Sequence, residues 1–318
     1  MRQLLTSMGE VLIDFLPIQA DGATTGFSMH AGGAPLNVAV GMARLGSPVA
    51  FAGKVATDFF GRYLRAYMES EGIDTRFLIS HEAFSTLAFV AMEDGEPAYA
   101  FYGEGAADTL LAPADVPEAL FDETAILHFG SISLLRGTTP NAVISTVERL
   151  KGRALLSFDP NLRPGLVRDE PAYRALLDRL FALADIVKLS AADISWLSPD
   201  RTPEQFALDL STRGPALVAV TQGGRGVLAQ RDPDAFRAPA FNVQVVDTVG
   251  AGDSFSAGLL AALHERGVTT RAALQSLPSD QLTQTLTFAS AVAALACSRP
   301  GADPPTRPQV EAFLQRHA

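Results

Sequence analysis

The sequence predicts an α/β protein with a doubly wound, mainly parallel sheet flanked by helices, and with a small additional β-sheet. Short apolar runs recur along the second half of the chain, and helix-like stretches lie between them. Continuous apolar runs of this length are typical of parallel strands buried on both faces. Their alternation with helices favours a sheet covered on both sides. A β-hairpin pattern near residue 90 breaks the alternation and indicates the additional sheet.

The N-terminal part of the chain begins this alternation. Strands are expected at residues 4–8 and 49–55, and a helix at residues 35–45. A second helix is expected at residues 58–71. It opens on Asp58, a good N-cap residue, and ends at Gly72, a common C-terminal stop.

Two further segments predict the additional sheet. Residues 86–92 and 98–102 favour β-structure and flank the turn Glu93-Asp94-Gly95-Glu96, which is typical of a hairpin. Residues 15–29 also do not fit the alternation. We expect segments 11–30 and 84–108 to form a lid on a single domain, residues 1–318. Because exposed sheet edges need cover, a homodimer formed through the lids is expected.

The second half of the chain supplies most of the main sheet. The expected strands and helices are 125–129, 139–150, 154–158, 171–183, 186–189, 202–212 and 217–221. Ligands of such folds bind beyond the carboxyl ends of the strands.

The composition excludes several classes of function. With 25 basic and 35 acidic residues, the chain has no electrostatic footprint for nucleic acid. No apolar run reaches the ~18 residues that a membrane span needs, and the N-terminal residues do not resemble a signal peptide. The single cysteine, Cys297, fits a reducing compartment. We therefore expect a cytoplasmic protein without nucleic-acid or membrane partners.

The run Gly250-Ala251-Gly252-Asp253 carries the strongest chemical signal. It lies between the polar, β-favouring residues 241–246 and the apolar, helix-like residues 255–264. Glycines let backbone N–H groups converge, and a helix N-terminus behind them favours a phosphate. A carboxylate at this point can accept the proton of an attacking hydroxyl. The run therefore predicts an anion hole beside a base for phosphoryl transfer.

Simpler readings compete with this prediction. The glycines can form an ordinary turn, and Asp253 can cap the following helix. Gly252-Asp253-Ser254 also fits a serine hydrolase, but no Asp-x-x-His follows Asp303. The chain lacks the phosphate-binding pattern G-x-x-x-x-G-K-[ST] and the third glycine of the dinucleotide fingerprint.

Two distant runs resemble signatures of the ribokinase-type (pfkB) carbohydrate kinases. Residues 247–255 look like the C-terminal signature of that family, and Gly32-Gly33-Ala34-Pro35-Leu36-Asn37-Val38-Ala39 looks like its N-terminal signature. The resemblance covers the whole chain and implies a ribokinase-like fold. It implies that Asp253 is the catalytic base and that Gly250, Ala251 and Gly252 form the anion hole.

The same resemblance implies residues that bind the substrates. Sugar hydroxyls are expected to contact Asp14, Gly32, Gly33, Asn37, Phe101 and Asp253. For the nucleotide, the resemblance centres on the loop after residue 221, although a plain hairpin is an equal alternative there. The nucleotide-binding residues it implies are Lys188, Ser190, Thr221, Gly223, Gly226, Gly250, Gly252 and Ser290.

The resemblance also implies cofactors. ATP is expected with Mg²⁺, held through water by Asp193. The run Ser190-Ala191-Ala192-Asp193 stands where the family has Asn-x-x-Glu, and capping of a helix by Ser190 is the rival account. K⁺ is expected near Asp247 and Val249.

Two features bear on the sugar. Residues 159–163 are similar to the Asp-x-Asn-x-Arg of fructokinases and 2-keto-3-deoxygluconate kinases, where Arg163 reaches the phosphate or an acid group of the substrate. Residues 101–108 resemble a fructokinase stretch, but Gly103 replaces its arginine. A keto-acid substrate needs a cation to pair its carboxylate. The leading expectation is therefore phosphorylation of a neutral hexose, fructose, at its terminal hydroxyl.

The sequence motifs are also compatible with other functions. Within the enzyme class these are 2-keto-3-deoxygluconate kinase, ribokinase and nucleoside kinase. A sugar or nucleotide sensor without turnover is the alternative from another class, and it would not need Asp253 together with the anion hole.

Overall fold

The computed structural model describes residues 3–20, 23–93 and 96–317 of the chain. Within them, a nine-stranded sheet has the order β13-β12-β11-β10-β9-β8-β1-β4-β5. Its strands are β1 Leu4–Met8, β4 Val49–Ala56, β5 Leu78–His81, β8 Thr124–Gly130, β9 Leu155–Asp159, β10 Ile186–Ser190, β11 Leu217–Thr221, β12 Val227–Arg231 and β13 Asp234–Ala238. The antiparallel pairings among these strands are β11–β12 and β12–β13, at one edge. The predicted mainly parallel sheet is confirmed.

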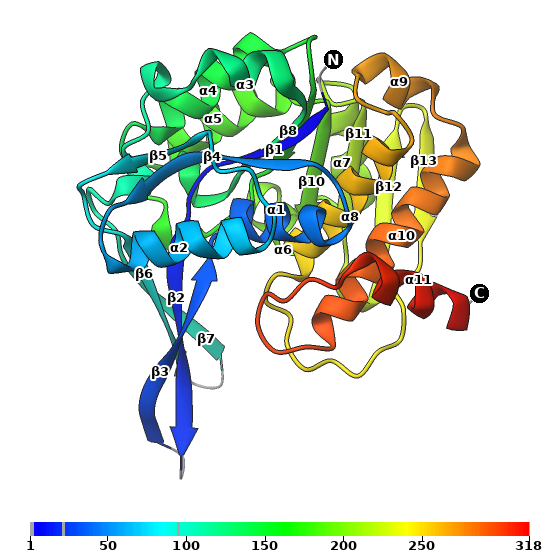
Figure 1. Cartoon of the computed structure of the whole chain (residues 1–318). Helices are drawn as coiled ribbons and strands as arrows, with labels where there is room; N and C mark the ends of the chain where they lie inside the picture. Colours follow the sequence, from blue (N-terminus) through cyan, green and yellow to red (C-terminus); the bar gives the residue numbers. More distant parts are fainter. Residues whose placement is uncertain (1–2, 21–22, 94–95, 318) are drawn as a thin grey trace.

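Helices cover both faces of this sheet (Figure 1). One face carries α3 Glu118–Glu123, α4 Thr139–Leu150, α5 Glu170–Leu183, α6 Ala191–Leu197 and α7 Pro203–Ser211. The other face carries α1 Ala34–Arg44, α2 Phe59–Ser70, α8 Ala251–Glu265, α9 Arg271–Ser276 and α10 Ser279–Cys297. The C-terminal helix α11, Arg307–Arg316, packs on α10. Each face has its own apolar core, as doubly wound folds require.

The predicted helix at residues 58–71 shows how local sequence sets an element. Asp58 Oδ1 accepts a hydrogen bond from the backbone N–H of Gly61 at 2.7 Å, so it caps α2 as expected. Helix α8 differs, because every residue from Asp253 to Leu263 is buried. A helix that is apolar on all sides belongs in a protein interior, and α8 packs between α1 and α10.

A second sheet of four strands projects from the body of the molecule (Figure 1). Its order is β3-β2-β6-β7, with β2 Leu12–Ala20, β3 Ala23–Gly32, β6 Thr86–Glu93 and β7 Glu96–Tyr102. Strands β6 and β7 pair antiparallel, as the hairpin pattern predicts. Residues 21–22, and residues 94–95 of the predicted turn, lie outside the described residues. The second sheet is confirmed, and its role as a lid stays a prediction.

Two details differ from the prediction. Residues 241–246 are irregular, because β13 already ends the sheet and leaves Val245 and Val246 exposed without a partner strand. Helix α8 begins at Ala251, four residues before the predicted start, so Asp253 lies inside its first turn. Across the described chain, none of the helices combines the length and apolarity that crossing a membrane requires.

Candidate functional site

Asp253 is the centre of the candidate site. Its carboxylate is only 7% exposed, and its Oδ2 accepts a hydrogen bond from Asn37 Nδ2 at 2.8 Å. The N-cap of α8 is Gly250, and the hydrogen bond recorded for the Asp253 carboxylate comes from Asn37 rather than from the backbone at the helix start. Burial raises the pKa of Asp253 above its ordinary value, against the opposing effects of Asn37, Lys188 and Arg163. A more basic carboxylate is a better proton acceptor.

The first turn of α1 brings Asn37 to this carboxylate. Gly33 is the N-cap of α1 and has a φ of 109°, where a side chain would be strained. A Cβ atom at Gly33 would also lie 2.8 Å from the carbonyl oxygen of Glu10. Gly33 is therefore needed to turn the chain from β3 into α1, which then presents Asn37 to Asp253.

Gly250, Ala251 and Gly252 form the start of α8. Gly250 is its N-cap and has the left-handed φ of 71°. The first N–H groups of a helix have no partners within the helix, and the helix dipole makes this end positive. The three residues thus stand where an anion hole is predicted, beside Asp253.

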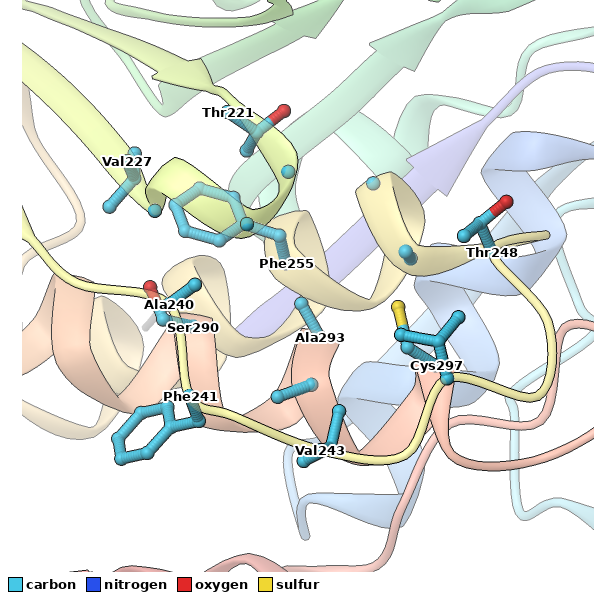
Figure 2. Close-up of a pocket in the computed structure, with 17 residues that line it drawn as sticks. Thr221, Val227, Ala240, Phe241, Val243, Thr248, Phe255, Ser290, Ala293 and Cys297 are labelled. Carbon is cyan, nitrogen blue, oxygen red and sulfur yellow. The ribbon is translucent and has the colours of Figure 1, made fainter.

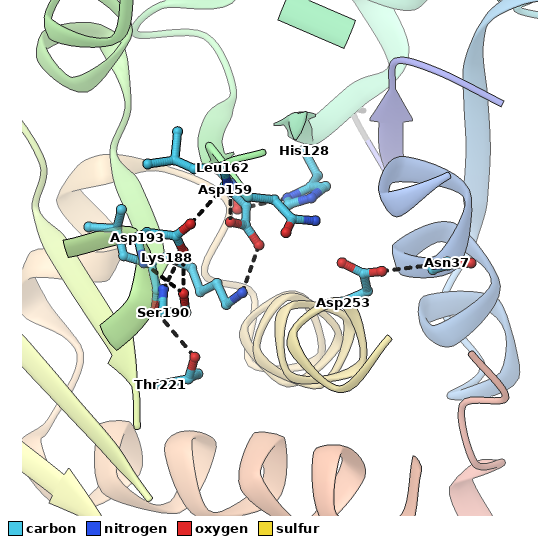
Figure 3. Close-up of polar contacts among 12 residues, drawn as sticks. Asn37, His128, Asp159, Leu162, Lys188, Ser190, Asp193, Thr221 and Asp253 are labelled. Atoms are coloured by element: carbon cyan, nitrogen blue, oxygen red, sulfur yellow. Dashed lines mark hydrogen bonds and ion pairs between the residues drawn. The ribbon is translucent and has the colours of Figure 1, made fainter. Parts of the chain in front are cut away.

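Lys188 approaches this helix start from β10. Its Nζ donates to Asp159 Oδ2 at 2.9 Å, and both side chains are almost fully buried. A Cβ atom at Gly252 would lie 2.7 Å from Lys188 Nζ, so glycine at 252 makes room for the ammonium group. In Figure 3, Asp253 lies between the Lys188–Asp159 pair and Asn37. Burial lowers the pKa of Lys188, but Asp159 and Asp193 outweigh it and keep the lysine charged.

Asp14 lies in β2, against Gly32 of β3. A Cβ atom at Gly32 would be 2.0 Å from Asp14 Oδ2, so only glycine leaves room for this carboxylate. Burial, and then the charge of Asp253, raise the pKa of Asp14 to about 6. The structure thus brings together Asp14, Asp253 and Asn37 from segments that are distant in the sequence.

Phe101 shares the face of the second sheet that carries Asp14. It pairs with Ala88 of β6, and Ala88 pairs with Asp14. Residues directly opposite one another on neighbouring strands point to the same face. Phe101 and Asp14 therefore lie on the same face of the second sheet, and the contact of Phe101 with the sugar stays a prediction.

A cavity of about 250 Å³ lies beside the start of α8 (Figure 2). The loop after β11 forms one wall, and α10 forms another. Thr221, Gly223, Gly226, Gly252 and Ser290 line it, together with Ala251 and Phe255. The loop joins antiparallel β11 and β12, so it is both a hairpin connection and part of the cavity wall. The two readings of this loop do not exclude each other.

Asp193 and Ser190 form a capping box at the start of α6. Asp193 accepts hydrogen bonds from the N–H and hydroxyl of Ser190, at 2.7 and 2.6 Å, and from Leu162 N–H at 2.9 Å. A carboxylate has about four acceptor positions, so little capacity is left for a metal-bound water. The capping account of Ser190 is thus correct, and the magnesium role of Asp193 stays a prediction.

Asp247 connects two loops near the start of α8. Its Oδ1 accepts from Val249 N–H at 3.0 Å, and its Oδ2 accepts from Gly301 N–H at 2.8 Å. Among residues 3–20, 23–93 and 96–317, no group of three or more His, Cys, Asp or Glu side chains is arranged to hold a metal ion. The K⁺ site expected here stays a prediction.

Arg163 follows β9 and is exposed. Its Nη1 donates to the side chain and backbone of Asn161, at 2.7 and 3.2 Å, and to Leu162 O at 3.0 Å. Its positive charge nevertheless opposes the rise in the pKa of both Asp14 and Asp253. Arg163 is therefore a cation at the rim of the site rather than an unrelated surface residue.

Two buried acids near the site were not predicted as functional. Glu10 is bonded to the backbone N–H and hydroxyl of Ser133, and Asp108 Oδ1 accepts from Thr86 Oγ1 at 2.6 Å. Burial raises the pKa of Asp108 to about 7, and the charge of Glu10 adds to the shift. Thr86 lies on the Asp14 face of the second sheet, since it pairs with Leu12. The burial of Glu10 and Asp108 beside the site results from tertiary packing, so no local sequence pattern indicates it.

The raised pKa of Asp108 predicts a pH-dependent stability. Unfolding lets Asp108 ionise above its ordinary pKa of 3.8, whereas the folded protein favours the protonated form up to about 7. Its contribution to stability is therefore lost as the pH rises from 4 to 7. Asparagine at position 108 does not ionise, so the variant Asp108→Asn lacks this pH-dependent contribution to stability. The Tm of the variant, relative to that of the parent protein, should therefore rise as the pH increases from 4 to 7. Thermal melts at pH 4, 5.5, 7 and 8 measure this difference, and a constant difference would contradict the assignment.

Comparisons with known proteins identify the family of the chain. A family model described as "pfkB family carbohydrate kinase" matches residues 2–309. A fructokinase from Rhizobium leguminosarum bv. trifolii is 36% identical over 279 residues, covering 88% of this chain and 85% of the relative. The crystal structure of a fructokinase with bound ATP from Xylella fastidiosa is 31% identical, with a TM-score of 0.92 over 100% of this chain and 99% of that one.

A second solved structure adds ligands to the comparison. It is a double mutant of a fructokinase from Vibrio cholerae O395 in a form with bound fructose, ADP and potassium ion. It is 28% identical and has a TM-score of 0.86, covering 98% of both chains. The family match and the shared fold agree. This chain is a ribokinase-like sugar kinase and belongs to the pfkB family of carbohydrate kinases.

Proposed function

We propose that this kinase transfers the γ-phosphoryl group of ATP to the terminal hydroxyl of fructose, giving fructose 6-phosphate. One observation carries the proposal: the buried carboxylate of Asp253, held by Asn37, adjoins helix residues that line a cavity. Proton acceptor and phosphate-binding amides are thus neighbours, as phosphoryl transfer requires. The similarity to fructokinases supports the choice of sugar.

The sugar lies between the second sheet and α1 in this mechanism. Asp14 and Asn37 bind its hydroxyls, while Gly32 and Gly33 let it lie against the backbone. Phe101 covers an apolar edge of the sugar ring. Asp253 accepts the proton of the hydroxyl as that oxygen attacks the γ-phosphorus and the bond to the β,γ-bridging oxygen breaks. Closure of the second sheet as a lid excludes water from this step.

The phosphates lie at the start of α8. The N–H groups of Gly250 and Gly252 donate to the oxygens of the moving group, where charge must be stabilised. The N–H of Ala251 donates to Thr248 O at 3.2 Å, so it joins them by exchanging that bond for one to the phosphate. Lys188 and Arg163 supply positive charge on either side. The nucleotide occupies the cavity lined by Thr221, Gly223, Gly226 and Ser290, with Ser190 at the end of the neighbouring strand β10.

The metal ions have a limited place in this proposal. Magnesium is usually bound through water and substrate phosphates rather than a protein cage. Asp193 would hold such a water through the one acceptor position, of about four, that its bonds from Ser190 and Leu162 leave open. When bound with ATP, Mg²⁺ neutralises phosphate charge. Potassium would be held near Asp247 and Val249, and the potassium-bound Vibrio structure supports including it.

The packing around Gly103 supports a neutral sugar. A Cβ atom there would lie 2.6 Å from Thr86 Oγ1, which already bonds to Asp108. The position where related fructokinase stretches carry an arginine is thus closed to a side chain. A keto-acid substrate would find no cation there for its carboxylate.

This packing makes a stability prediction. Gly103→Ala should destabilise the protein by about 1–3 kcal/mol, because it forces Thr86 and the buried Asp108 to move. Gly165→Ala is the matched control, since a Cβ atom at 165 meets nothing within 4 Å. Urea denaturation of both variants measures the difference. Equal midpoints would show that Thr86 does not restrict position 103.

We also propose that the second sheet pairs with that of a second copy. Its outer strand β3 presents an exposed edge, and Phe27 of that strand is 44% exposed. Edges of this kind need cover. A monomeric mass by light scattering at micromolar concentration would remove this part of the proposal.

A substrate screen tests the proposed function. ADP release is measured with fructose, glucose, mannose, ribose, 2-keto-3-deoxygluconate and adenosine, each with and without K⁺. Fructose should give the highest kcat/KM, and the product should be identified by its phosphorus–carbon coupling in NMR spectra. Preference for 2-keto-3-deoxygluconate would overturn the choice of sugar. Ligand binding without ADP release would indicate a sensor instead of an enzyme.

A further inference from the structure

Arg44, the last residue of α1, joins three segments of the chain. Its Nε and Nη2 donate to the carboxylate of Glu71 at 2.8 and 2.6 Å. Its Nη1 donates to Asp303 Oδ1 at 2.5 Å and to Pro304 O at 2.8 Å. Hydrogen bonds to Glu71 raise the pKa of Arg44 despite its partial burial, so the guanidinium stays charged. A bidentate pair of this kind fixes orientation as well as charge.

The loop formed by residues 299–304 connects Arg44 to the start of α8. Gly301 N–H donates to Asp247 Oδ2 at 2.8 Å. A Cβ atom at Gly250 would lie 2.6 Å from Ala302 Cβ, so Ala302 packs directly on the N-cap of α8. Ala302 of this loop therefore packs against Gly250, and Arg44 binds the same loop through Asp303 and Pro304.

The packing between α1 and α8 leaves this loop little freedom. A Cβ atom at Gly41 would lie 2.6 Å from Ala257 Cβ in α8 and 3.5 Å from Pro304 Cβ. Helix α1 carries Asn37, the hydrogen-bond partner of Asp253. The Arg44–Asp303 pair therefore joins α1 to the loop that packs on Gly250. Helix α1 is also the helix whose Asn37 orients the carboxylate of Asp253.

We propose that Arg44 is a positioning residue for the anion hole, acting through Asp303 and the 299–304 loop on Gly250. This inference rests on the proposed phosphoryl transfer at α8. Without Arg44, Asp303 is left with the longer bond from Arg299 Nη1 to its Oδ2, at 3.3 Å. The loop then loosens, Ala302 moves away from Gly250, and the backbone amides after Gly250 lose their orientation. Misplacement by about 1 Å in an active site costs roughly a hundredfold in rate.

Four variants separate positioning from stability. Arg44→Met and Asp303→Asn should each lower kcat by roughly tenfold to a hundredfold, with the KM for the sugar unchanged. Glu71→Gln is the matched control, because it weakens the other ion pair of Arg44 and leaves Asp303 in place. We expect it to keep kcat within about twofold while lowering Tm at least as much as Asp303→Asn. The Arg44→Lys variant should recover part of kcat.

A second readout does not depend on the sugar. Hydrogen–deuterium exchange of residues 247–254 should become faster in Asp303→Asn and Arg44→Met but not in Glu71→Gln. A fall in kcat that follows Tm alike in all three variants would overturn the inference, as would unchanged exchange in Asp303→Asn. Absence of turnover in the parent protein would instead contradict the proposed function, and the exchange experiment would still test the positioning by Arg44.

Discussion

Asp253→Asn should abolish most of the turnover while leaving both substrates bound. The amide oxygen of asparagine can still accept the hydrogen bond from Asn37 Nδ2, so the fold around α8 is kept. It cannot accept the proton of the sugar hydroxyl. General-base catalysis contributes about 10²- to 10⁴-fold, and kcat should fall by a factor in this range. Steady-state ADP release and calorimetric binding of ATP and sugar measure the two effects separately.

The pH profile provides a further check on Asp253. Burial raises its pKa, so kcat of the parent protein, measured at saturating sugar, should decline on the acidic side at a higher pH than an ordinary carboxylate would cause. Asp253→Asn should lose this limb in its residual activity. Ser254→Ala is the control, since a hydrolase reading would need the Ser254 hydroxyl and the kinase reading does not. Near-normal kcat in Asp253→Asn, or a large loss in Ser254→Ala, would refute the assignment.

The parallel sheet could be predicted because its signals are local. Helix α4 has the predicted bounds, and Asp58 caps α2 as its residue type suggests. Short apolar runs such as β8 and β11 need no distant partner to be recognised. Residues 241–246 show the limit, because whether a β-favouring segment pairs depends on where the sheet ends.

The candidate site was only partly predictable for a related reason. Asp253 stands out through its neighbouring glycines, and Asn37 through a second motif. Their 2.8 Å hydrogen bond depends on how α1 packs against α8. The sequence predicts that Gly252 gives access to its amide, and its missing side chain also makes room for Lys188. Such contacts join residues far apart in the chain, and a local pattern does not contain them.

The carboxylates of the site shift one another's pKa values. The charge of Asp253 raises the pKa of Asp14. The charges of Asp193 and Asp253 raise the pKa of Asp159, and its partner Lys188 lowers it. Burial comes first in each case and raises the pKa of Asp14 and Asp159 to about 6. Acids that ionise near neutral pH can exchange protons with a substrate hydroxyl more readily than ordinary carboxylates. The same tuning makes sugar binding sensitive to mild acid.

Asp14→Ala should weaken sugar binding and spare the nucleotide. Loss of a hydrogen bond to a charged group costs about 1.5–3 kcal/mol, which corresponds to a rise of roughly 10- to 150-fold in the KM for the sugar. The KM for ATP should not change, because Asp14 lies on the second sheet and does not line the nucleotide cavity. In the parent protein, sugar affinity should fall as the pH drops through about 6, where Asp14 becomes protonated.

Gly32→Ala provides an independent test of the same carboxylate. The added Cβ would lie 2.0 Å from Asp14 Oδ2, so it must displace a carboxylate that remains in the chain. The variant should therefore reproduce the high sugar KM of Asp14→Ala. Gly26→Ala, in the same hairpin, is the control, because its Cβ would be 3.9 Å from the only contacting atom, Ile18 Cδ1. A normal sugar KM in Gly32→Ala, or an altered ATP KM in Asp14→Ala, would show that Asp14 does not hold the sugar.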